Sequence, residues 1–144
     1  MGKRGGKMGT LVRRNIDEMV DEAVAALDAG GTKKYPLIEG RIVAVFATPD
    51  DATSARMAMG ISVLPPGYST PVHHHAAEEF AMIVRGTGSI TIDDEVIPVG
   101  PGDLVVTPPD SLHVTTSFGD EQLVVYWSYG PAGSEQRWLQ RSEE

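Results

Sequence analysis

The sequence predicts an all-β barrel or sandwich preceded by one amphipathic helix. Short runs of β-forming residues recur from Arg41 onward, and clusters of Gly, Pro and Asp separate them. The absence of cysteine excludes a disulfide scaffold, and 144 residues with 41% hydrophobic content suit one core. We therefore expect an arm and helix over residues 1–34, a barrel over 35–130 and a tail over 131–144.

The chain starts with a basic arm and continues into a helical pattern. The arm holds Lys3, Arg4, Lys7, Arg13 and Arg14, and no apolar run of the secretory type follows, so we expect a cytoplasmic protein. Residues 12–27 place apolar side chains at three- and four-residue intervals, which predicts an amphipathic helix. Asn15 with Glu18 resembles a capping box, and Gly30-Gly31 is a plausible stop. The apolar face of this helix can cover a sheet or a second subunit.

The remainder of the chain predicts strands and no second helix. The run at 56–64 alternates, with Met57, Met59, Ile61 and Val63 on one face, and we expect that face to look inward. Trp138 in the tail is a candidate anchor. The eight expected strands span residues 41–47, 56–64, 80–85, 89–92, 96–99, 104–107, 114–118 and 122–129.

The charge of the chain excludes two classes of partner. A net charge of −8 argues against nucleic acid and against anionic membranes, because both need concentrated Lys and Arg. No stretch approaches the roughly 18 consecutive apolar residues of a membrane span. An acidic substrate would need a local positive centre.

Three of the four histidines are consecutive, at His73, His74 and His75. In an extended segment alternate side chains share a face, so His73 and His75 project together and His74 projects the other way. Glu79 has the same parity and enters an apolar run, where an unpaired carboxylate is expensive to bury. A cation held by these groups would remove that cost, and without cysteine any metal falls to histidine and carboxylate.

The fourth histidine, His113, completes a pattern that resembles the cupin superfamily. The first cupin motif needs Gly, His, His, Glu and Gly at set spacings, and the second needs Gly, Pro, Gly, His and Asn. The first is matched at every position and the second at three, with Asp110 in place of the second Gly and Ser117 in place of the Asn. The matching residues are Gly67, His73, His75, Glu79, Gly86, Gly102, Pro108 and His113. Asp tolerates a left-handed turn, so Asp110 should keep the bend.

The resemblance implies a jelly-roll β-barrel with a metal site inside. Its metal ligands would be His73, His75, Glu79 and His113, and its cofactor one divalent transition metal: Fe, Mn, Ni, Zn, Co or Cu. Ligand type does not select among these metals. Cupins are commonly dimers, so we expect a homodimer.

Three functions remain open for such a site. The first is redox-neutral Lewis-acid chemistry (isomerase, lyase, decarboxylase or cyclase) on a small substrate that carries a carboxylate or carbonyl group. The second is an Fe(II)-dependent dioxygenase, and the third a non-catalytic module that binds a metal or small ligand. We lean to the first.

The candidate proton acceptors are Glu79 and Tyr68. The candidate pocket walls are Met59, Ala81, Ile83, Tyr126 and Trp127, of which Ala81 and Ile83 share the parity of Glu79. Tyr126 and Trp127 face opposite ways, so only one of them can line the barrel.

Overall fold

The computed structural model describes residues 13–142, and most of the basic arm, residues 1–12, lies outside that range. The eight expected strands are all present, each within two residues of the predicted bounds, and a two-residue strand precedes them. The elements are α1 (Ile16–Asp28), β1 (Leu37–Ile38), β2 (Arg41–Ala47), the 3-10 turn η1 (Pro49–Asp51), β3 (Ala58–Leu64), β4 (Glu78–Arg85), β5 (Gly88–Ile92), β6 (Glu95–Val99), β7 (Leu104–Thr107), β8 (His113–Ser117), β9 (Leu123–Gly130) and α2 (Gln136–Ser142).

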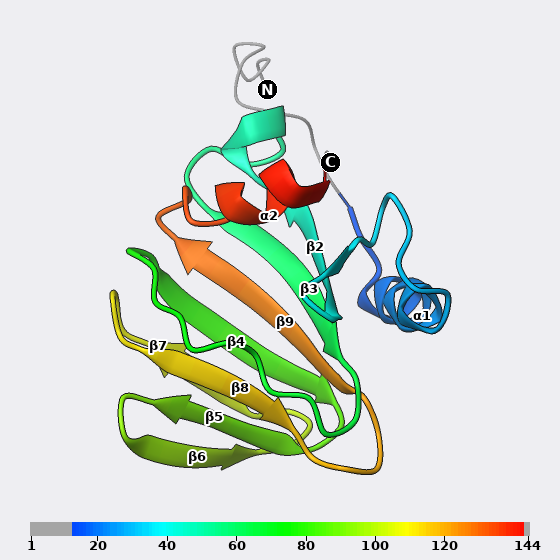
Figure 1. The fold of residues 1–144 in the computed structure, drawn as a ribbon. Helices are drawn as coiled ribbons and strands as arrows, with labels where there is room; N and C mark the ends of the chain where they lie inside the picture. Colours follow the sequence, from blue (N-terminus) through cyan, green and yellow to red (C-terminus); the bar gives the residue numbers. More distant parts are fainter. Residues whose placement is uncertain (1–12, 143–144) are drawn as a thin grey trace.

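Two antiparallel sheets form the β-structure (Figure 1). One has the order β1-β2-β3-β9-β4-β7 and the other β6-β5-β8. A buried apolar cluster joins them, with Ile83, Val105 and Val125 from the larger sheet and Ile90 and Val99 from the smaller. The expected all-β jelly-roll architecture with an N-terminal helix is confirmed.

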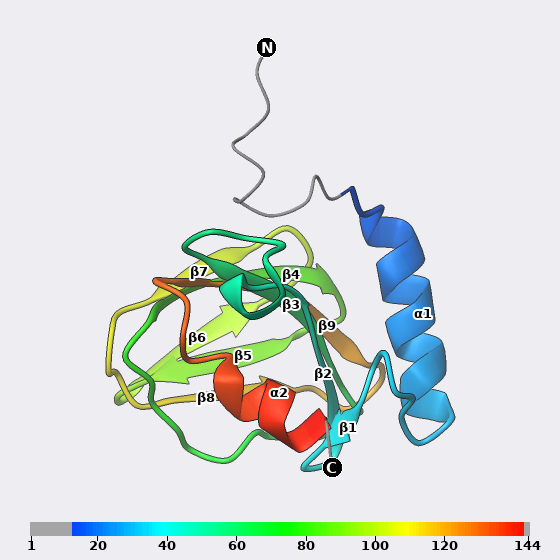
Figure 2. The ribbon, with the colours of Figure 1, turned by 90° about the horizontal axis from the view of Figure 1, so that it is seen from above.

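Helix α1 begins where the capping signal places it. The Asn15 side chain accepts a hydrogen bond from the Glu18 amide at 3.1 Å, and the helix ends before Gly30 and Gly31, which both have positive φ. Its apolar side packs on β2 and β3, so the helix lies along the outside of the sheet (Figure 2). That face is buried within the subunit, and the helix therefore does not offer it to a second copy.

Strand β3 is buried on both faces, which corrects the expected orientation of its apolar side chains. Ile61 and Val63 pack with α1 on the outer face of the sheet, not in the barrel, and Met57 is 48% exposed. Ser62 and Leu64 point to the interior instead. Alternation identifies two faces of a strand, but it does not say which apolar layer each face meets.

Helix α2 corrects the expectation of a single helix. It has only seven residues, too few to show an apolar period in the sequence. Trp138 is 4% exposed, so it anchors the tail as expected. The buried Glu135 carboxylate accepts hydrogen bonds from the Gly133 amide (2.6 Å) and the Thr48 hydroxyl (2.7 Å), which ties the start of α2 to the turn before η1. Among residues 13–142, no helix is both long and apolar enough to cross a bilayer.

Candidate metal centre

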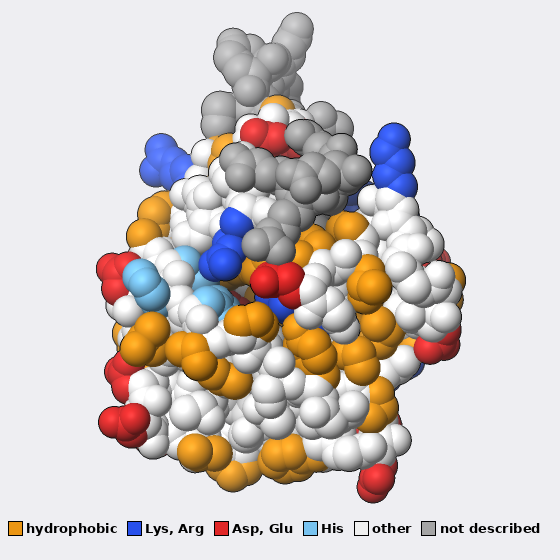
Figure 3. All heavy atoms as spheres, viewed as in Figure 1, with side chains coloured by type: hydrophobic (Ala, Val, Ile, Leu, Met, Phe, Trp, Pro, Cys, Tyr) orange, Lys and Arg blue, Asp and Glu red, His pale blue; other side chains and the backbone are white. Residues whose placement is uncertain are grey.

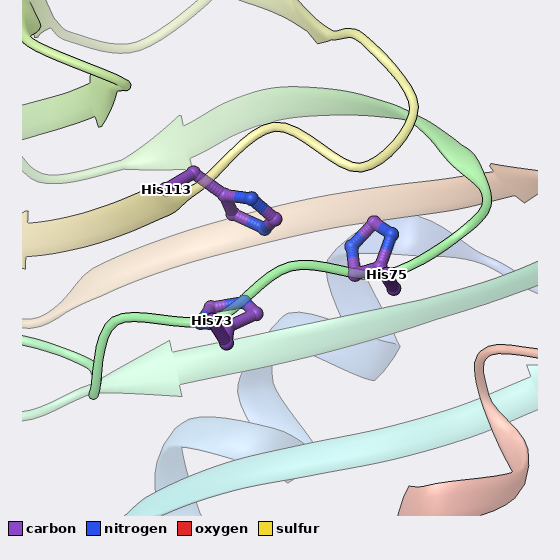
Figure 4. A group of neighbouring side chains, drawn as sticks. All are labelled: His73, His75 and His113. Carbon is purple, nitrogen blue, oxygen red and sulfur yellow. The ribbon is translucent and has the colours of Figure 1, made fainter.

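Two distant segments bring three histidines together. His73 and His75 lie in the loop before β4, and His113 is the first residue of β8. Antiparallel backbone hydrogen bonds join His73 and His113, with N···O distances of 3.2 and 2.9 Å. The Asp110 amide donates to the His75 carbonyl at 2.8 Å. In Figure 4 the three imidazoles point toward one another, and one nitrogen of each lies within 4.8 Å of the others.

Each imidazole is oriented by a backbone carbonyl two residues away. The Nδ1 atoms of His73, His75 and His113 lie 2.8, 2.9 and 2.9 Å from the carbonyl oxygens of Pro71, Ala77 and Ser111. A carbonyl only accepts, so each Nδ1 carries a proton, and a ring that holds no second proton has its lone pair on Nε2. Backbone partners of this kind commonly set the tautomer of metal-binding histidines.

Glu79 completes the cluster from the start of β4. Its Oε1 atom lies 3.0 Å from His75 Nε2 and 3.6 Å from His113 Nε2. His113 Nε2 is buried and has no hydrogen-bond partner among the described residues. Buried polar atoms are rarely left unsatisfied, and a buried lone pair without a donor beside a carboxylate fits a bound cation. The neighbouring His74 and Glu78 are exposed.

Burial favours the neutral form of two of the three imidazoles, those of His73 and His113. Burial lowers the pKa of His73 to about 4, against the opposing effect of its bond to the Pro71 carbonyl. Burial likewise lowers the pKa of His113. Rings that stay unprotonated at neutral pH are the form that binds a metal, so this donor set of three imidazoles and one carboxylate can hold a divalent ion.

The two departures from the cupin motif leave this geometry in place. Asp110 has φ 61°, so it adopts the left-handed turn that Gly would take. Ser117 is 1% exposed, and its hydroxyl bonds the carbonyl oxygens of Phe118 and Glu121 instead of reaching the histidines.

A cavity of about 50 Å³ lies beside the cluster. Three aromatic side chains form one wall: Trp127 stacks on Tyr129 with centroids 4.6 Å apart, and the Trp138 indole N–H donates to the Tyr129 hydroxyl at 3.1 Å. Burial raises the pKa of Tyr129, so this hydroxyl stays protonated. Figure 3 shows histidine side chains bordering a hollow, with basic and acidic side chains close by. The lining residues are Arg41, Val43, Ser62, Leu64, Thr70, His73, Glu79, His113, Thr115, Val125, Trp127, Tyr129 and Trp138.

The expected pocket residues divide into three groups. Trp127 lines the cavity. Ala81 and Ile83 share the interior face with Glu79 but pack in the apolar core between the two sheets. Met59 has the parity of Ile61, which faces α1. The Tyr126 ring packs edge-on against Phe46, with ring centroids 5.5 Å apart. Met59 and Tyr126 therefore lie outside the cavity lining.

Tyr68, the second candidate base, lies beside Arg41. Its hydroxyl accepts a hydrogen bond from Arg41 Nη1 at 3.2 Å and donates to the Glu39 carbonyl oxygen. The phenol proton is therefore already engaged with the backbone.

Nine residues that line the cavity were not anticipated from the sequence, and the three with the largest side chains are Arg41, Tyr129 and Trp138. Tyr129 has the parity of Trp127, a signal that the sequence does carry. Arg41 has the parity of Val43 on β2, but an arginine at the start of a strand more often faces solvent. Trp138 reaches the cavity through α2, which the sequence pattern does not reveal.

Comparison with known proteins supports the fold. A family model described as a cupin domain matches residues 60–129. The chain is similar to the uncharacterized protein MJ1618 of Methanocaldococcus jannaschii, with 29% identity over 105 residues that cover 72% of this chain and 84% of that protein. It is similar to a gentisate 1,2-dioxygenase of Ralstonia sp, with 36% identity over 104 residues, which cover 68% of this chain and 29% of that enzyme. Among solved structures, a cupin protein from Bacteroides fragilis is 30% identical with a TM-score of 0.56, covering 64% of this chain and 78% of that one.

Proposed function

Because the chain belongs to the cupin family, we propose that it is a metal-dependent enzyme acting on a small substrate with a carboxylate or carbonyl group, by redox-neutral chemistry. The reaction classes are those of an isomerase, a lyase, a decarboxylase or a cyclase. The observation that carries this proposal is the convergence of three imidazoles and the Glu79 carboxylate at a cavity, where the buried His113 Nε2 has no hydrogen-bond partner within residues 13–142.

The proposed ligands of the ion are His73, His75, His113 and Glu79. A divalent metal bound there would act as a Lewis acid and stabilise negative charge that develops on the substrate. The carbonyl partners of the three Nδ1 atoms hold the rings in one tautomer, so the chain presents its donors without rearrangement.

The other residues of the cavity have roles that follow from their contacts. Trp127, Tyr129 and Trp138 cover one side and exclude water from it. Glu79 lines the cavity, so its carboxylate is the group best placed to take up a substrate proton, through the oxygen that does not bind the ion. Tyr68 is better suited to hold Arg41, since its own proton is donated to the Glu39 carbonyl.

A specific observation favours a second candidate, an Fe(II)-dependent dioxygenase. The similarity to a gentisate 1,2-dioxygenase reaches 36% identity, although the chain spans less than a third of that enzyme. Imidazole and carboxylate ligands suit iron as well as the other divalent metals.

Elemental analysis of protein purified without chelator, followed by an assay panel of small carboxylates and ketones, tests the proposal. We expect about one transition-metal ion per chain and turnover without oxygen consumption. Oxygen uptake with an iron-loaded protein would favour the dioxygenase instead. Tight ligand binding without turnover, whichever metal is loaded, would indicate a non-catalytic binding module. The His113→Ala variant controls for activity from contaminating metal.

The assembly and location of the protein remain predictions. Sedimentation at two protein concentrations tests the expected homodimer, for which α1 does not supply the apolar face. Cell fractionation tests the expected cytoplasmic location.

A further inference from the structure

We propose that Arg41 is the residue that recognises the substrate, and that the substrate is therefore an anionic carboxylate and not a neutral carbonyl compound. The inference rests on the proposed function, since it assumes that the cavity beside the four-residue cluster receives the substrate. It adds the chemical class of the ligand and the residue that selects it.

The first support is the burial of a charge. Arg41 begins β2 with its side chain in the interior, and the residue is only 4% exposed while lining the same cavity as His73 and Glu79. A guanidinium does not lose its proton in proteins, so its charge needs compensation when it leaves water.

The contacts of this guanidinium compensate that charge incompletely. Among the described residues, its polar side-chain contacts are made by Nη1, to the Tyr68 hydroxyl at 3.2 Å and to a Glu39 carboxylate oxygen at 4.0 Å. The first partner is neutral, and the second lies beyond hydrogen-bond distance. A carboxylate in the cavity would provide the missing charge-assisted hydrogen bond.

The side chain is also held in place in advance. Its guanidinium carbon lies 5.2 Å from the Trp138 ring centroid, and the Tyr68 hydroxyl that it contacts is itself fixed by the Glu39 carbonyl. An arginine ordered before the ligand arrives loses little rotamer freedom on binding, which favours affinity.

The charge balance of the cavity points to the same ligand class. Among the residues that line the cavity, Arg41 and Glu79 carry opposite charges, so a divalent ion would leave that lining with two excess positive charges; the Glu39 carboxylate near Arg41 lies outside the lining. One carboxylate would neutralise half of that excess. The positive cavity would therefore attract an anion, whereas the net charge of −8 makes the rest of the chain repel anions. A cavity of about 50 Å³ has room for roughly three to five waters, which suits a short carboxylate.

The alternative is a purely structural Arg41 that closes one end of the barrel by packing on Trp138. A structural arginine would affect stability but not the preference of the site for charge. Ligand pairs that differ only in charge separate the two roles.

Calorimetry on Ni²⁺-loaded protein, with acetate, pyruvate and oxalate compared with their neutral amides, provides the test. The variants are Arg41→Gln and the apolar, similarly long Arg41→Met. The matched control is Arg85→Gln, which removes a half-exposed arginine paired with Asp21 on the outside of the molecule. Metal content and thermal unfolding are measured on every sample.

We expect the wild type to bind at least one carboxylate more tightly than its amide. Both Arg41 variants should lose roughly 10- to 100-fold of carboxylate affinity, as expected for a charge-assisted hydrogen bond, while amide binding and Arg85→Gln change little. Equal carboxylate affinity in the wild type and a folded Arg41 variant would overturn the inference, as would a wild type that binds no carboxylate.

Failure of the inference and failure of the proposed function give different results. A protein that takes up no metal refutes the metalloenzyme proposal, whatever Arg41 does. In that case, carboxylate binding by the metal-free wild type that Arg41→Gln abolishes still supports Arg41 as the recognition residue. Full metal uptake with carboxylate binding unaffected by either variant leaves the metal site intact and removes the role of Arg41.

Discussion

Replacing His113 with Ala should remove most of the stabilisation that a bound metal gives this protein. A ligand that binds only the folded state stabilises it by RT ln(1 + [L]/Kd), which is about 2.7 kcal/mol at 100 times Kd. Loss of a group that merely orients a ligand costs roughly 10- to 100-fold in metal affinity, so loss of a ligand should cost at least 100-fold. At the same metal concentration the stabilisation then falls to about 0.4 kcal/mol or less.

The assay is thermal unfolding with and without metal. For a chain of this size 1 kcal/mol corresponds to roughly 2–4 °C, so metal should raise the wild-type midpoint by about 5–11 °C and that of His113→Ala by about 2 °C at most. The metal-free variant should remain folded, because the substitution also removes a buried Nε2 atom that has no partner in the described part of the chain. His74→Ala is the matched control, since the His74 side chain is 61% exposed and outside the cluster. The same metal-induced shift in His113→Ala and His74→Ala would refute the proposed ligand set.

Three further substitutions or conditions probe the site. Gly60→Ala should destabilise the fold by about 1–3 kcal/mol in urea unfolding, because a Cβ would lie 2.2 Å from the Trp127 indole. The control Gly119→Ala should not destabilise the fold, because Gly119 has open space around it. Equal urea midpoints for the two variants would contradict the close contact between Gly60 and Trp127. Glu79→Gln should weaken metal binding at least about tenfold in a chelator competition, since the anionic ligand is lost, and an unchanged affinity would show that its charge is not used. In the metal-free protein, stability should fall as pH drops from about 6.5 toward 4, because burial lowers the pKa of His73 to about 4 and the unfolded chain therefore binds the proton first. Denaturation at several pH values measures how the free energy of unfolding changes with pH. An equally steep change in a His73→Gln variant would contradict the assignment of this pH dependence to His73.

The strands were predictable because their signals are local. Turn residues and short β-rich runs determine where each strand begins and ends, and the first motif already aligned His73, His75 and Glu79 by parity. Even the substitution at Asp110 was readable, since its positive φ is one that Asp tolerates.

The residues that escaped prediction depend on contacts between distant segments. Ile61 alternates like a barrel residue, but the packing of α1 on the outer face decides which layer it joins. Arg41 becomes part of the cavity only because β2 lies beside β3 and because α2 brings Trp138 over its guanidinium. Neither fact is encoded within a window around Arg41.

The backbone bridge between His73 and His113 has a consequence for metal selection. Because backbone hydrogen bonds already join the loop before β4 to the start of β8, the spacing of these two donors would be set by the protein and not by a bound ion. A scaffold of this kind can exchange one divalent ion for another without refolding. The metal recovered from a given preparation would then report the supply in the host cell, and only reconstitution with each ion in turn would reveal the one that the chemistry requires.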